Sequence, residues 1–157
     1  MNKKMLSRQE YDKWIATLPK DKCTFCEWEQ YQIVLKEFKH WVWIANIAPY
    51  WYWHTIILSK RHFVEFHDQS FQEVAELLTV LDYTKKKFID AKLYRKTGEL
   101  VEKFVYFWRL RLNRFDPISK TVRPDHFHIH LAPDKDHLWD STLDENAHLL
   151  DIKDKLE

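Results

Sequence analysis

Glycine is almost missing from this 157-residue sequence, in which Gly98 is the single example. Average proteins contain about 7 % glycine. The shortage excludes a phosphate-binding loop built on several glycines, whose backbone N–H groups would surround the anion. A phosphate group must therefore be held by side chains or by another arrangement.

The sequence also lacks an excess of charge of one sign, since it contains 25 Lys and Arg and 24 Asp and Glu, for a net charge of +1. This balance gives no broad basic surface for nucleic acid. No apolar run approaches the roughly 18 residues of a membrane helix. The N-terminal segment MNKKMLSRQEYDKW is charged and has no apolar core of the signal-peptide kind. We therefore expect a cytoplasmic protein with neither nucleic acid nor a membrane as partner.

Cysteine is limited to Cys23 and Cys26, spaced C-x-x-C. In a reducing compartment this spacing indicates metal ligands or a redox pair before a structural disulfide. Two free thiols remain a third possibility.

Hydrophobic residues, by contrast, are plentiful. They make up 45 % of the chain, and eight of them are Trp. This is enough apolar material for one densely packed domain over 1–157.

Hydrophobic periodicity and turn signals divide the chain into helices and strands. Ser70 and Glu73 have the spacing of a capping box, which places a helix start there. We expect helices at 6–17 and 71–92, strands at 28–35, 41–47, 54–58, 104–113 and 126–132, a polar loop at 114–123 and an acidic tail from 134. This order predicts an α+β meander with the long helix across one face of the sheet.

The most informative segment is His126-Phe127-His128-Ile129-His130-Leu131-Ala132. Strict alternation indicates a strand with its apolar side chains in a core and three imidazoles on the opposite face. An imidazole, with a pKa near 6.5, can act as a nucleophile, a proton carrier or a metal ligand. Three structural histidines, or a three-histidine metal site, remain alternatives at this point.

These residues fit the motif His-φ-His-φ-His-φ-φ, where φ is apolar, and two more blocks agree. Asn46-Ile47-Ala48-Pro49, followed by His54-Thr55-Ile56-Ile57-Leu58-Ser59-Lys60-Arg61-His62, is similar to a second motif, and Cys-x-x-Cys precedes both. The sequence thus resembles the histidine triad family over 22–133, in particular zinc-bearing bacterial members of the diadenosine polyphosphate hydrolase type. The resemblance implies a roughly five-stranded, mainly antiparallel sheet with one long helix, flanked by an N-terminal helix within 1–21 and a C-terminal tail at 134–157.

The resemblance also implies a reaction. Family members are mostly nucleotidyl hydrolases or transferases that act at the α-phosphate of a dinucleoside polyphosphate, a phosphoramidate or a similar ester. The middle histidine, here His128, would form a covalent nucleotidyl intermediate. His130 would contact the phosphate or the leaving group, and His54 would support the triad. Asn46 would contact the ribose, and Asn113 would help to hold the phosphate or the nucleophile.

A second set of residues, Cys23, Cys26, His62 and His126, matches the structural zinc ligands of zinc-bearing members. Two thiolates and two imidazoles form a closed tetrahedral site, which stabilises a fold and leaves no position for a substrate. A homodimer is also expected, because family members usually pair through the long helix and a strand.

One departure concerns the Gly-Gln-Ser/Thr segment that usually precedes the triad, where this chain has Thr121, Val122 and Arg123. Val122 cannot replace an amide, whereas Arg123, with Lys120 beside it, offers a cation to phosphate. The aromatic run at 50–53 is expected either to line a base pocket or to belong to the core or a dimer surface. The departure leaves two other functions open: a non-catalytic, zinc-stabilised nucleotide-binding module, and a metallohydrolase with the histidines as catalytic ligands.

Overall fold

The structure is a computed structural model that describes residues 6–19, 21–49, 53–94, 98–108, 115–116, 121–122, 125–134 and 155–156. Its helices are α1 (Arg8–Ala16), α2 (Trp28–Tyr31) and α3 (Phe71–Ala91), with a 3₁₀ turn at Phe66–Asp68. Its strands are β1 (Ile33–Glu37), β2 (Trp41–Ala45), β3 (Thr55–Ser59), β4 (Phe104–Phe107), β5 (Phe115–Asp116), β6 (Thr121–Val122) and β7 (His128–Pro133). No helix in these ranges is long and apolar enough to span a bilayer.

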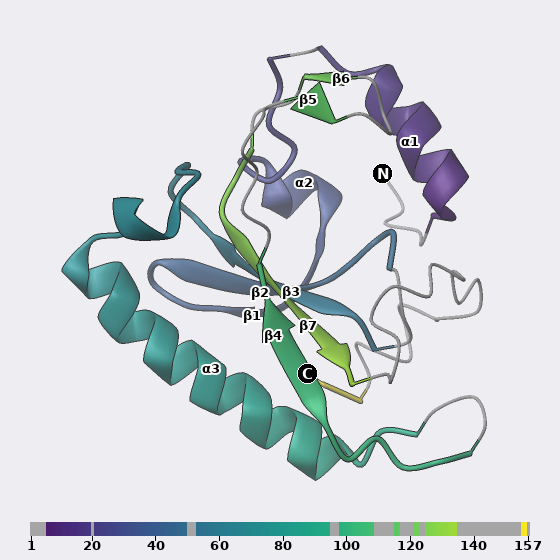
Figure 1. Cartoon of the computed structure of the whole chain (residues 1–157), viewed down its shortest axis with the longest axis vertical. Coiled ribbons are helices and arrows are strands. Elements are labelled where there is room, and N and C mark those ends of the chain that lie inside the picture. Colours follow the sequence, from purple (N-terminus) through teal and green to yellow (C-terminus); the bar gives the residue numbers. More distant parts are fainter. Residues whose placement is uncertain are drawn as a thin grey trace.

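Five strands form one sheet in the order β1-β2-β3-β7-β4, and each neighbouring pair is antiparallel. The histidine strand β7 is the last in sequence but lies between β3 and β4. Helix α3 runs across one face of this sheet (Figure 1). The predicted α+β fold, with a five-stranded antiparallel sheet, one long helix and a short N-terminal helix, is therefore confirmed.

The two faces of the sheet are covered by different elements, and β2 and β3 are buried on both. Toward α3, Trp41, Trp43 and Ile57 belong to one core cluster with Leu77 and Val80. On the other face, Val42, Ile44, Ile56 and Leu58 form a smaller cluster with Trp28 of α2. Burial on both sides accounts for the near-continuous apolar sequence of these two strands.

The start of α3 is fixed by the predicted capping box. Ser70 Oγ accepts the Glu73 backbone N–H at 3.2 Å, and the Glu73 carboxylate accepts the Ser70 N–H at 2.6 Å. The helix ends at Lys92, which has a left-handed backbone with φ 47°. Gly98, with φ 84°, lies between Tyr94 and Leu100, which form an isolated β-bridge. The left-handed region favours glycine, so the single glycine lies where a turn requires it.

Three local predictions are wrong. The strand expected at 28–35 is half helix: Gln32 N–H donates to Trp28 O at 2.8 Å, and β1 begins only at Ile33. The polar loop expected at 114–123 contains the paired strands β5 and β6. His126 lies just before β7 rather than in it. The expected strand 104–113 is present as β4, and most of its second half lies outside the described residues.

Candidate active site and metal centre

Two of the three histidines lie side by side on one face of β7. The β3–β7 register places His128 opposite Leu58 and His130 opposite Ile56, so both imidazoles share the sheet face turned away from α3. Ile129 and Leu131 point the other way, into the main core. The predicted alternation between core and chemistry is confirmed for β7 itself.

The His128 ring is held in one orientation by the chain that precedes it. Its Nδ1 lies 2.7 Å from the backbone O of His126. A carbonyl oxygen only accepts hydrogen bonds, so Nδ1 carries the proton and the lone pair of the neutral ring is on Nε2. The Phe25 ring packs against this imidazole edge-to-face, with ring centroids 4.9 Å apart. His128 is thus oriented with a nucleophilic nitrogen on its far side.

His130 is more deeply buried, with 5 % of its surface exposed. Its Nδ1 lies 2.9 Å from Nε2 of His54, which is fully buried. Phe107 of β4 stacks on the His130 ring at 4.8 Å with an interplanar angle of 13°. The His128 and His130 ring centroids are 4.7 Å apart, so a group bound at one imidazole also reaches the other.

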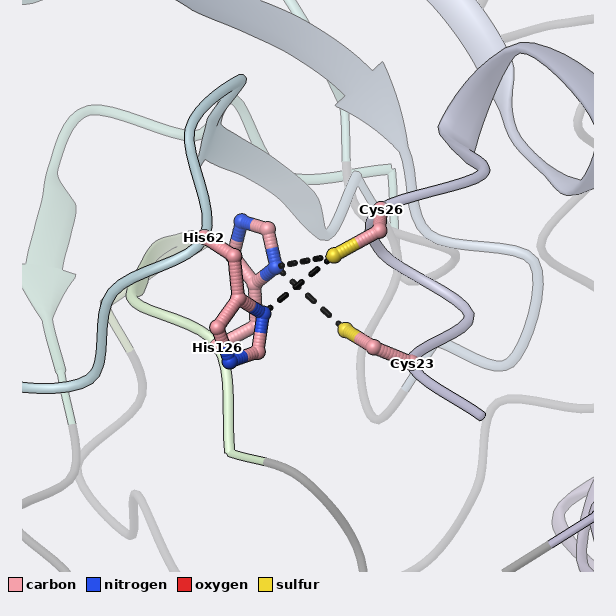
Figure 2. A group of neighbouring side chains, drawn as sticks. All are labelled: Cys23, Cys26, His62 and His126. Atoms are coloured by element: carbon pink, nitrogen blue, oxygen red, sulfur yellow. Dashed lines mark hydrogen bonds between the residues drawn. The ribbon is translucent and has the colours of Figure 1, made fainter. Parts of the chain in front are cut away.

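The four predicted metal ligands converge from three separate segments (Figure 2). Cys23 and Cys26 come from the turn before α2, His62 from the segment after β3 and His126 from the residues before β7. Their ligand atoms all lie within 4.8 Å of one another. Cys23 Sγ lies 3.4 Å from His126 Nδ1, and Cys26 Sγ lies 3.2 Å from His62 Nδ1 and 3.5 Å from His126 Nδ1. Tetrahedral zinc, with bonds of about 2.3 Å to sulfur and 2.0 Å to nitrogen, sets such pairs about 3.5 Å apart.

The protonation chemistry of these residues also fits a cation. His126 Nε2 lies 2.7 Å from the backbone O of Ser59 and donates its proton there, which leaves the Nδ1 lone pair directed at the sulfurs. Burial lowers the pKa of His126 to about 4, so the ring is neutral, as a metal ligand must be. Partial burial, with the Cys23 thiol beside it, raises the pKa of Cys26 to about 12. A bound Zn²⁺ reverses this effect because it stabilises both thiolates.

An ion pair anchors the segment that carries His62. The neighbouring Arg61 donates from Nε and Nη2 to the two carboxylate oxygens of Glu73, at 2.9 and 2.8 Å, and from Nη2 to the backbone O of Asp68 at 2.7 Å. Glu73 is 3 % exposed, and the hydrogen bonds from Arg61 lower its pKa to about 2. The N-terminus of α3 is thereby tied to the residue that precedes His62, a predicted metal ligand.

The remaining predicted site residues are only partly described. Asn46 is buried beside His54, with its Nδ2 3.1 Å from His54 Nδ1. Asn113, Arg123, Lys120 and the aromatic residues 50–52 lie outside the described residues. Trp53 is 6 % exposed and belongs to the main core, where its Nε1 donates to Tyr94 O at 2.9 Å.

Two aromatic contacts were not predicted. Phe25 packs on His128 and Phe107 stacks on His130. The position of Phe25 between the two cysteines was a usable signal, because a metal-bound turn has a defined place against the histidine strand. Nothing in the sequence around Phe107 indicated which strand would lie beside β7.

The sequence matches no described protein family and no curated protein. Solved structures do match. A zinc-bound histidine triad family protein from Mycobacterium smegmatis is 18 % identical, with 86 % of this chain and 93 % of that chain covered and a TM-score of 0.56. A hypothetical histidine triad nucleotide-binding protein from Sulfolobus tokodaii strain7 is 20 % identical, with 73 % and 70 % covered and a TM-score of 0.54. This chain has the histidine triad fold.

A uridylyltransferase has the histidine triad fold too, over part of its length. It is 16 % identical, with 93 % of this chain and 48 % of that chain covered and a TM-score of 0.59. This chain therefore spans about half of that larger protein. The fold thus occurs both in chains close to this one in length and as part of a longer enzyme.

Proposed function

We propose that this protein is a nucleotidyl hydrolase or transferase that acts at the α-phosphate of a nucleotide substrate through a covalent nucleotidyl-His128 intermediate. The observation that carries the proposal is the hydrogen bond from His128 Nδ1 to His126 O, which puts the lone pair of the nucleophile on Nε2. Proteins of the same fold that are described as nucleotide-binding or as a uridylyltransferase support the substrate class.

In the proposed first step, His128 Nε2 attacks the α-phosphorus, and a P–N bond forms as the P–O bond to the leaving group breaks. The ring becomes cationic, and the hydrogen bond from Nδ1–H to the His126 carbonyl strengthens as charge develops. His130, 4.7 Å away between ring centroids, donates a hydrogen bond to the departing oxygen, which leaves as an oxyanion. Water or a second acceptor then attacks phosphorus and gives its proton to solvent. The P–N bond breaks and its electron pair returns to Nε2, which restores the neutral ring, so one difficult displacement becomes two easier ones.

The metal centre has a structural role in this proposal. Cys23, Cys26, His62 and His126 would hold Zn²⁺, which when bound ties three chain segments together and stabilises both thiolates. With two sulfur and two nitrogen ligands the site is closed. His126 then holds the nucleophile through its backbone carbonyl, while its side chain belongs to the metal site.

The substrate contacts remain predictions. Asn113 and Arg123 are proposed to lie along the bound nucleotide, whereas for Asn46 the ribose contact implied by the resemblance competes with a role through its hydrogen bond to His54. A dinucleoside polyphosphate, as in the diadenosine polyphosphate hydrolase type, is the first substrate to test. The two free cysteines are consistent with the proposed reducing, cytoplasmic location.

We also propose a homodimer formed by α3 and β4. The outer side of α3 carries exposed apolar residues, with Phe71 84 %, Leu78 67 % and Ile89 63 % exposed. Strand β4 lies beside this helix, because Tyr106 Oη donates to Leu81 O at 3.3 Å and Phe104 stacks on Phe88. Among the described strands β4 pairs only with β7 and so is the last strand of this sheet, where we propose that a second copy of the chain pairs with it.

The test is product formation from dinucleoside polyphosphates, nucleoside phosphoramidates and nucleotide sugars by wild type and by His128→Ala. We expect wild type to release a nucleoside monophosphate or to transfer it, and the variant to lose turnover by a factor of at least about 10³. His67→Ala, at a histidine whose side chain is 81 % exposed, is the matched control and should retain activity.

The covalent intermediate is tested separately. Intact-protein mass measured shortly after mixing, in denaturant without acid, should show one nucleotidyl group on wild type and none on His128→Ala. Equal activity of both proteins would refute the assignment of the nucleophile. Nucleotide binding without turnover by wild type would instead support the non-catalytic binding module.

A further inference from the structure

The side chain of Asn46 lies where the β2–β3 pairing continues past the ends of both strands. Ala45 pairs with Thr55, and the Asn46 backbone N–H donates to His54 O at 3.4 Å, so Asn46 and His54 face each other one step further along. Alternation along these strands puts both side chains on the same sheet face as Ile44 and Ile56. This is the face that carries His130, which pairs with Ile56.

The orientation of the Asn46 amide is determined by its neighbours. The backbone N–H of Ala48 donates to Oδ1 at 3.0 Å. The reversed amide would place two donors against each other there, so Oδ1 must face Ala48. Nδ2 consequently faces His54 Nδ1, 3.1 Å away. An amide nitrogen only donates, so His54 Nδ1 is an acceptor and carries no proton.

The same argument continues through the two rings. A neutral His54 without a proton on Nδ1 has it on Nε2, and this N–H donates to His130 Nδ1 at 2.9 Å. His130 therefore has its own proton on Nε2. These hydrogen bonds are shielded from water, since Asn46 is 9 %, His54 0 % and His130 5 % exposed. The two rings therefore differ at Nε2, which carries a proton in His130 and the lone pair in His128.

We propose that Asn46 is a positioning residue, which sets the proton positions of His54 and, through it, of His130, so that His130 presents an N–H hydrogen-bond donor to the leaving group. The consequence for the reaction rests on the proposed function, whereas the hydrogen-bond chain does not. Replacing Asn46 by aspartate would change the group that faces His54 from a hydrogen-bond donor to an acceptor. A carboxylate only accepts, so it would place the proton of a neutral His54 on Nδ1 and remove the donor that faces His130.

The first test needs no activity. Two-bond ¹H–¹⁵N correlation spectra of wild type at neutral pH distinguish the protonated from the unprotonated nitrogen of each ring. We expect the proton of His54 and of His130 on Nε2, and in Asn46→Asp a proton on His54 Nδ1. His54 with its proton on Nδ1 in wild type would overturn the proposal, and because wild type alone decides this, an unfolded variant does not remove the test.

The second test is a double-mutant cycle, measured with whichever substrate of the panel wild type turns over. Asn46→Asp should lower kcat about 100-fold, the scale of one lost hydrogen bond to charge that develops in the transition state, with a smaller change in KM. His54→Gln, whose amide N–H can still donate to His130, should remain within about tenfold of wild type. In the His54→Gln background Asn46→Asp should have little further effect, because both changes act on the same hydrogen-bond chain.

A ribose contact makes different predictions for the same variants. If Asn46 acts by binding the ribose, Asn46→Asp changes mainly KM and alters the preference for ribonucleotide over 2′-deoxyribonucleotide. These effects should then be the same in wild type and in the His54→Gln background. That outcome would overturn the positioning role. If wild type turns over no substrate, the proposed function fails, and the spectra still decide on the Asn46–His54–His130 chain.

Discussion

Replacing Glu73 by Gln should destabilise the protein by an amount that depends on pH. Both carboxylate oxygens accept from Arg61, and one also accepts the Ser70 N–H. A pKa lowered from 4.5 to about 2 corresponds to roughly 3 kcal/mol of stabilisation at neutral pH. The Arg61 side chain is 51 % exposed, so solvent screening reduces this to about 2 kcal/mol.

The Gln variant isolates the charge, because Gln at this position still serves a capping box. A loss of about 2 kcal/mol in a chain of this length lowers Tm by about 4 to 8 °C. The folded-state pKa of Glu73 is depressed, so its contribution is fully present above about pH 4.5 and is lost as pH falls toward 2. Wild type and Glu73→Gln should therefore converge in stability at low pH.

Urea unfolding of both proteins at pH 7, 5, 4 and 3, each in the presence of a chelator so that no metal is released during the series, measures this difference directly. The exposed ion pair of Lys86 with Asp82 on the same helix provides the control, and Asp82→Asn should cost less than about 0.5 kcal/mol. A Glu73→Gln loss below about 0.5 kcal/mol at pH 7, or one that stays constant down to pH 3, would refute the reasoning.

Three further predictions concern the metal, the nucleophile and the dimer. A strong chelator should lower the Tm of wild type by more than about 5 °C, because the proposed metal joins three segments, and should leave the Tm of Cys26→Ser unaffected. Loss of turnover with an unchanged Tm would indicate a catalytic metal instead. Phe25→Leu should lower kcat about tenfold with little change in KM, since the ring orients His128 and is proposed to touch no substrate; unchanged kinetics would remove that role. Leu78→Glu should convert a dimer into monomers in sedimentation velocity without lowering helix content, and a wild-type monomer would contradict the proposed interface.

The parts of the fold that the sequence predicted well are those with a strong local signal. Helix α3 combines a capping box at Ser70 with apolar residues at helical spacing, and its bounds differ from the prediction by one residue at the C-terminal end. Strand β7 alternates between apolar residues and histidine. The four predicted metal ligands were proposed from residue type and motif, neither of which requires the fold, and the structure brings these residues together.

The parts that were missed depend on short elements or on register. Helix α2 has four residues, fewer than periodicity needs for a decision, and its Trp28 is buried against the sheet by tertiary packing. Strands β5 and β6 have two residues each and stand out only through their pairing. A supporting role for His54 was implied by the resemblance, but its pairing with His130 in particular depends on the β3–β7 register, which one sequence does not determine.

His126 belongs to both sites at once, with its ring against the cysteines and its carbonyl on His128. The predicted metal site and the proposed nucleophile are therefore separated by a single residue. Co²⁺ prefers the same tetrahedral set of nitrogen and sulfur ligands and absorbs visible light. Substituted into this centre, it would make the protein coloured, and its spectrum should respond when His128 gains or loses a nucleotidyl group. The proposed intermediate would then be observable in real time, with an unlabelled substrate.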